Sequence, residues 1–143
     1  MYEDIIGIIW CEPLRLGRDF GYALLITSKS ITGAKLDTFT HTLIRYVGPG
    51  SNITQEDRNQ AEGAAWEITN KKDFEISKDE ITEIVYKKPG VLSGGYVVFN
   101  TAKEPVRLIL PSIFVDTQVS LVWNNLIRSL ISFAPDKLRN EKA

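Results

Sequence analysis

The chain is poor in the residues that most often carry catalysis or bind metals. Its 143 residues include one cysteine, Cys11, and one histidine, His41. A single cysteine forms no intramolecular disulfide and no metal cluster, and its place in an apolar run predicts a buried thiol in a reducing compartment. A mechanism that needs histidine would have to use His41, which stands between two threonines in a predicted strand with no nucleophile elbow nearby. These residue types predict a domain that is not an enzyme.

Sequence motifs for metals and phosphates are also missing. The acidic residues between positions 73 and 83 lack the turn glycine and the final glutamate of a calcium-binding loop. The glycine-containing stretches 48–50 and 90–95 lack the lysine and hydroxyl residue of a phosphate-binding loop. Charged surface and turns account for these stretches, so we expect no metal site and no cofactor.

Long apolar runs are absent. The N-terminal run Ile5–Cys11 has seven residues, too few for a secretory signal and far below the roughly 20 residues of a membrane helix. The sequence therefore predicts a cytoplasmic protein without a transmembrane segment. The 17 basic and 18 acidic residues leave a net charge of −1, which provides no broad positive field for nucleic acid.

The chain does have the composition of one globular domain over residues 1–143. Apolar residues make up 43% and charged residues 24%, which is ordinary for a soluble protein. A chain of this length is typically built on one hydrophobic core. The polar residues 136–143, after Pro135, predict a disordered tail.

Seven stretches have the β-branched and aromatic composition of strands. The pattern is densest over residues 76–110, where Pro89–Gly90 and Gly94–Gly95 separate strands of a predicted antiparallel meander. Nearer the N-terminus, Pro13 is expected to end the first strand and to start a loop over Leu14–Asp19. The predicted strands are Ile5–Glu12, Gly21–Thr27, Ser30–Lys35, Thr40–Val47, Glu83–Lys88, Tyr96–Asn100 and Val106–Leu110.

Two segments have the features of helices. Residues 54–70 begin with Thr54 followed three positions later by Asp57, which is typical of a helix cap, and Trp66 and Ile68 are expected to hold this helix on the domain. Residues 116–133 have apolar side chains at spacings of three and four, which predicts an amphipathic helix that covers the meander. Its predicted stripe contains Val119, Val122, Trp123, Leu126, Ile127, Leu130 and Ile131.

The order of four strands, three strands and a closing helix resembles the pleckstrin-homology-like (PH-like) superfold. Residues 22–33, YALLITSKSITG, resemble the strand-turn-strand signature of bacterial and archaeal PH-like domains, and residues 81–110 resemble their later meander. The resemblance implies a mainly β (α+β) fold, a partly open barrel of about seven antiparallel strands capped by the helix near 116–133. The helix near 54–70 would be an insertion into that minimal fold.

PH-like domains serve several functions, and the surface decides among them. We expect a non-enzymatic module for protein binding or self-association, because an open sheet leaves an edge for strand addition. Leu121 and Phe133 fall outside the main apolar stripe and are candidate interface residues. The partner would be another protein or a second copy, and no nucleic acid is expected.

The resemblance also implies an alternative, which is peripheral binding to anionic lipid or phosphoinositide headgroups. In lipid-binding PH domains the loop between the first two strands supplies the basic residues that hold phosphate groups. The corresponding side chains here are Arg15, Arg18, Lys29 and Lys35.

Overall fold

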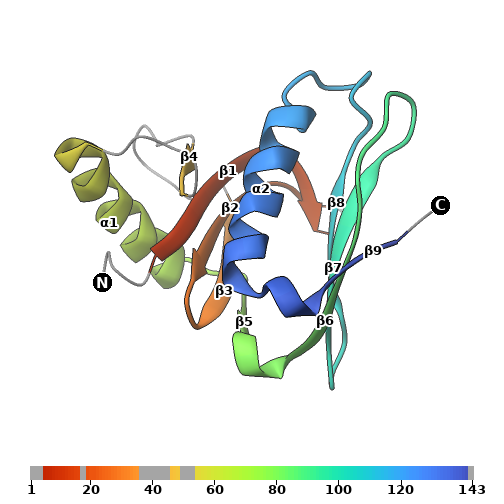
Figure 1. The fold of residues 1–143 in the computed structure, drawn as a ribbon. Helices are drawn as coiled ribbons and strands as arrows, with labels where there is room; N and C mark the ends of the chain where they lie inside the picture. The colour runs from red at the N-terminus through yellow and green to blue at the C-terminus, as the bar shows by residue number, and fades with distance from the viewer. Residues whose placement is uncertain (1–4, 17–18, 36–45, 49–53, 142–143) are drawn as a thin grey trace.

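The structure, a computed structural model, describes residues 5–16, 19–35, 46–48 and 54–141. These residues form a mainly β fold with two α-helices, so the predicted α+β class is confirmed (Figure 1). The elements are β1 (Ile5–Leu16), β2 (Asp19–Thr27), β3 (Ser30–Lys35), β4 (Tyr46–Val47), α1 (Gln55–Asn70), β5 (Phe74–Ser77), η3 (Lys78–Glu80), β6 (Ile81–Lys87), β7 (Gly95–Thr101), β8 (Val106–Leu110), α2 (Val119–Phe133), η4 (Pro135–Lys137) and β9 (Leu138–Asn140).

The strands form one hydrogen-bonded sheet in the order β5-β3-β2-β1-β8-β7-β6-β9, with β4 paired to β1. The predicted meander is present as β6, β7 and β8, which pair in antiparallel order. It joins the N-terminal half of the sheet through a short contact, in which Arg15 and Leu16 of β1 pair with β8. Because the path starts at β5 and ends at β9, the described strands form an open sheet rather than a closed barrel.

Both faces of the N-terminal half of the sheet are covered by a helix, and Figure 1 shows α1 and α2 on opposite sides of β1 and β2. Along β2, Tyr22, Leu24 and Ile26 belong to the core cluster that contains α2. The alternate residues Ala23 and Leu25 belong to the cluster that contains α1. This double burial explains why the strand is an almost continuous apolar run.

Helix α1 confirms the predicted cap but not the predicted anchor. The Thr54 hydroxyl accepts a hydrogen bond from the Asp57 N–H at 3.1 Å, and the Asp57 carboxylate accepts one from the Thr54 N–H at 3.1 Å. Ile68 is buried as expected, together with two alanines, whereas Trp66 is 70% exposed. The small alanine side chains let the helix lie close to the sheet, and Trp66 lies off the buried face of the helix.

Helix α2 confirms the predicted amphipathic helix with a shifted apolar stripe. Asn125 and Ser129 are buried, while Ile131 of the predicted stripe is 50% exposed. Phe133 lies on the same side as Ser129 and is 1% exposed, which corrects the expectation that it contributes to a surface. Lys78 lies over the Phe133 ring, 5.5 Å from its centre, and packs the end of the helix against η3.

Two boundaries differ from the prediction because strand pairing outweighs local signals. β1 continues beyond Pro13 to Leu16, with an irregular register between Cys11 and Arg15, so Arg15 lies in a strand rather than a loop. The prediction of a disordered tail is wrong for Leu138–Asn140, which pairs in parallel with β6. The Glu141 N–H extends that pairing to the Tyr86 carbonyl at 2.8 Å.

Two further differences concern the number and extent of the strands. Of the predicted strand Thr40–Val47, Tyr46–Val47 forms β4, and residues 40–45 lie outside the described residues. Strand β5, which the sequence did not predict, pairs with β3.

Neither α1 nor α2 is long and apolar enough to cross a membrane.

Candidate functional site

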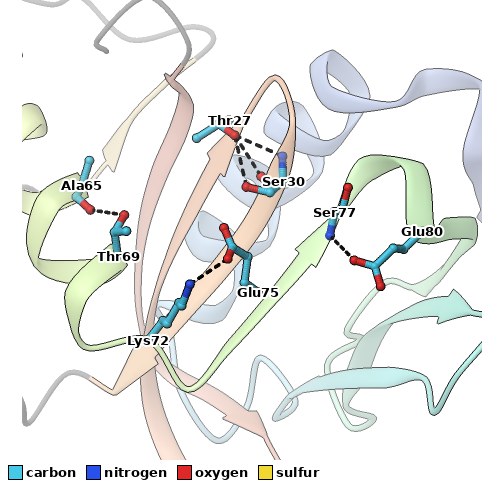
Figure 2. Close-up of polar contacts among 8 residues, drawn as sticks. All are labelled: Thr27, Ser30, Ala65, Thr69, Lys72, Glu75, Ser77 and Glu80. Atoms are coloured by element: carbon cyan, nitrogen blue, oxygen red, sulfur yellow. Dashed lines mark hydrogen bonds and ion pairs between the residues drawn. The ribbon is translucent and has the colours of Figure 1, made fainter.

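A groove of about 870 Å³ lies between α1 and the part of the sheet that contains the β2–β3 turn and β5. Figure 2 shows part of its polar lining, which comes from α1, the ends of β2 and β3, β5 and η3: Thr27, Ser30, Thr69, Glu75, Ser77 and Glu80. Its lining residues are Ile5, Leu25, Thr27, Lys29, Ser30, Glu62, Ala65, Trp66, Thr69, Glu75, Ser77 and Glu80.

One wall of the groove is the flank of α1 that contains Trp66. The indole is largely exposed, with Glu62 one turn before it on the same flank. Thr69 donates a hydrogen bond from its hydroxyl to the Ala65 carbonyl at 2.8 Å, so this hydroxyl is satisfied within the helix (Figure 2). The wall therefore offers an aromatic face and a carboxylate to a ligand.

The β2–β3 turn closes one end of the groove. The Thr27 hydroxyl accepts hydrogen bonds from the N–H groups of Lys29 at 3.2 Å and Ser30 at 3.1 Å. These bonds fix the turn in the manner of a Ser/Thr turn. The Lys29 side chain is exposed at the edge of the groove.

The opposite wall is β5, the last strand on its side of the sheet. The Ser77 N–H donates to the Glu80 carboxylate at 3.2 Å rather than to β3, so it faces away from the sheet (Figure 2). In a strand, N–H groups two residues apart face the same side. The Glu75 N–H therefore faces the same open edge.

The groove is acidic. Among its described lining residues are the carboxylates of Glu62, Glu75 and Glu80 and one amine, that of Lys29. Lys72 lies beside the groove and forms an ion pair with Glu75 at 2.8 Å, in which both side chains are about 40% exposed. A positively charged ligand suits this surface better than a phosphate.

The predicted basic residues do not form one cluster. Lys29 lies at the β2–β3 turn, whereas Lys35 pairs with Tyr22 at the far end of β3. Six residues of extended chain separate the two lysines by about 20 Å. Arg15 lies beyond Lys35, where β1 meets β8, and Arg18 lies outside the described residues. One headgroup is too small to reach Lys29 together with Lys35 or Arg15.

The other predicted residues are also apart. Leu121 is 54% exposed on α2, while Phe133 is in the core. His41 lies outside the described residues, so its predicted lack of a catalytic role stays a prediction. Within the described part of the chain, no group of three or more His, Cys, Asp or Glu side chains is placed to hold a metal ion.

No family model, curated protein or solved structure matches this chain. The resemblance of residues 22–33 and 81–110 to PH-like domains therefore stays a prediction. The groove and the surfaces of the structure are therefore the basis for a proposed function.

The sequence prediction missed Trp66 as an exposed groove residue, Glu75 and Ser77 as a strand edge, and Glu80 of η3 beside that edge. The helical position of Trp66 relative to the alanines would have placed it on the outer side of α1. The sequence FEIS of β5 gives no comparable signal, because four residues are too few to show a period.

Proposed function

We propose that this domain is a non-enzymatic protein-interaction module that binds an extended, positively charged segment of a partner protein along β5. The observation that supports this is the presence, in one groove, of the strand edge of Glu75 and Ser77, the carboxylates of Glu62 and Glu80, and the exposed Trp66. Main-chain hydrogen bonds would provide affinity and alternate side chains would provide specificity.

The backbone step of this binding uses two N–H groups. The incoming strand would accept a hydrogen bond from the Glu75 N–H and would replace the Glu80 carboxylate at the Ser77 N–H, where the bond is 3.2 Å long. Displaced from Ser77, the Glu80 carboxylate becomes available to a cation on the peptide. β5 has four residues, so the paired part of the ligand is short.

The side chains of the groove favour lysine or arginine at the positions of the peptide that face α1. A cation over the Trp66 ring gains about 0.5–1 kcal/mol at an exposed site. Arginine adds a planar fork that matches a carboxylate such as Glu62. The volume of about 870 Å³ lies in the range of about 300–1,000 Å³ that is usual for ligand sites.

A partner protein fits this edge better than a second copy of the chain. Antiparallel pairing of β5 with β5 of another copy would bring Glu75 and its neighbouring carboxylates close to the same residues of the second chain. Like charges in directly opposed positions are destabilising. Light scattering over a wide concentration range is therefore expected to show a monomer, and a concentration-dependent dimer lost in Glu75→Pro would indicate self-association instead.

Selection of phage-displayed random peptides against the purified domain tests the proposal. We expect binders with basic residues at alternate positions. Glu75→Pro removes the outward N–H and leaves the bonds to β3, so binding should fall at least about tenfold, more than in Glu75→Ala, which keeps that N–H. Trp66→Ala should weaken binding by about two- to fivefold.

Two results would overturn the proposal. Peptides that bind Glu75→Pro and wild type equally would show that β5 is not the binding edge, provided circular dichroism shows that both are folded. An enzymatic turnover that is lost in His41→Ala would contradict the non-enzymatic part.

A further inference from the structure

Four large apolar side chains are exposed on two neighbouring loops at one end of the sheet. Val91 and Leu92 lie between β6 and β7 and are 65% and 85% exposed. Phe114 and Val115 lie between β8 and α2 and are 78% and 72% exposed. We call these four residues the apolar tip, and Figure 1 shows its two loops beyond the start of α2.

Backbone hydrogen bonds hold the two loops together. The Gly90 carbonyl accepts from the Ile113 N–H at 2.9 Å, and the Val91 carbonyl accepts from the Phe114 N–H at 3.1 Å. The Ile113 side chain packs against the core and anchors the loop between β8 and α2. The exposed side chains are therefore presented by an ordered pair of loops.

A small cavity of about 100 Å³ lies near the apolar tip, and Ile113, which precedes Phe114, lines it. Lys88, Ser120 and Asn124 provide polar groups to it, and Trp123 and Ile113 provide an apolar wall. Lys88 is exposed, so its amine can reach a ligand from solvent. This volume and these donors suit one phosphate group.

The shape and area of the apolar tip favour a membrane over a protein as its binding partner. Its four side chains expose roughly 300–500 Å² of apolar surface, well below the about 800 Å² that each side of a stable protein interface buries. The tip projects on loops, whereas protein interfaces of standard size are broader. Exposed apolar side chains with a basic residue nearby fit the boundary between acyl chains and headgroups.

We propose that the apolar tip inserts into the interfacial region of a lipid bilayer, while Lys88, Ser120 and Asn124 of the adjoining cavity contact a headgroup phosphate. This site is separate from the groove at β5. The apolar tip lies before the first turn of α2. At the other end of the helix, Phe133 contacts Lys78, which directly follows β5. The 15 residues of α2 separate these two ends by about 22 Å. A membrane and a peptide can therefore be bound at the same time.

Vesicle flotation tests the proposal, with vesicles of phosphatidylcholine alone and with added phosphatidylserine. Wild type is expected to float with both and more strongly with the anionic vesicles. Leu92→Glu and Phe114→Glu should each lower the partition coefficient at least about tenfold. Lys88→Gln should lower it about fivefold on anionic vesicles, because one basic residue near such a surface contributes about that factor.

Ile131→Glu is the matched control, since it also replaces an exposed leucine-sized side chain by glutamate, at the opposite end of α2. It should float like wild type, and circular dichroism should show the same fold for all variants. Wild type that stays unbound on both vesicles would overturn the proposal, as would equal flotation of Leu92→Glu and Ile131→Glu. A concentration-dependent dimer that only the Leu92→Glu and Phe114→Glu variants lose would assign the tip to a second copy and also contradict it.

Discussion

Gly33 and Phe74 lie opposite each other where β3 pairs with β5. The Phe74 ring covers the glycine so closely that an added Cβ would collide with the ring. The ring also contacts Tyr22, with 6.4 Å between the ring centres. This aromatic cover compensates for the missing side chain of the glycine and helps to hold β5, and therefore the groove, on the sheet.

Gly33→Ala is expected to destabilise the domain by about 1–3 kcal/mol, because the Phe74 ring must leave its position. Gly63→Ala is the matched control. An added Cβ there meets no atom within 4 Å, and alanine in a helix gains about 0.5–1 kcal/mol over glycine. Urea denaturation measures both free energies of unfolding, and equal effects of the two substitutions would contradict the role of the Phe74 ring.

At the residue scale, the sequence allowed prediction where the cause is local. The cap of α1 depends on Thr54 and Asp57, which are three positions apart, and it was found correctly. Trp66, predicted to be an anchor because of its size, is instead exposed. It lies five positions after the buried Ala61, which places it about 140° around the helix and on the outer side.

Among the single elements, β9 is joined to β6 by an ion pair as well as by backbone pairing. The Arg139 guanidinium donates a hydrogen bond to the Glu83 carboxylate at 2.8 Å. This bond, more than the charge of the arginine, lowers the pKa of Glu83 below its ordinary value of 4.5. A carboxyl whose pKa is lowered on folding stabilises the folded state above its unfolded pKa, and this contribution is lost as the pH falls.

The docking of β9 is therefore expected to weaken as the pH falls below about 4.5. The Glu141 N–H, which is bonded to the Tyr86 carbonyl at 2.8 Å, should lose protection from hydrogen exchange in that range. In Glu83→Gln its protection should be lower at neutral pH and nearly independent of pH. Glu104→Gln, in the β7–β8 turn, is the control, and the same pH response in Glu83→Gln as in this control would refute the role of the ion pair.

The meander could be predicted because its turns are marked by proline and glycine in the sequence. β5 and β9 could not, since they have four and three residues and are strands because they pair with β3 and β6. Such pairing joins segments that are distant in sequence, and local propensity does not reveal it. This is why the β5 side of the groove was missed, although its acidic residues were noted.

At the scale of the whole molecule, stability depends on the strands that lie between the two helices. Leu24 is fully buried in the cluster that contains α2. Leu24→Ala is expected to cost about 2–5 kcal/mol, because the cavity cannot close between a sheet and a helix. Leu92→Ala, at an 85% exposed position of the apolar tip, should change stability by less than about 0.5 kcal/mol. Thermal or urea unfolding compares the two, and similar losses would show that the tip is part of the core.

Both surfaces proposed for binding arise from the packing of distant segments. The groove combines α1 with a turn and a strand, and the apolar tip combines two loops. The mainly β class and both helices followed from sequence patterns, but no pattern stated which exposed side chains would meet. The predicted basic residues illustrate this, since Lys29 lies in the turn before β3 and Lys35 is the last residue of that strand.

Hydrogen exchange of the Glu75 N–H is the most direct test of whether a basic peptide pairs with β5. Two-dimensional NMR would follow this amide with and without a peptide selected against the domain. We expect the Glu75 amide to become protected on binding, because the peptide accepts its hydrogen bond, and we expect no change at the amides of β9. Saturating peptide that leaves the exchange of Glu75 unchanged would contradict pairing with β5.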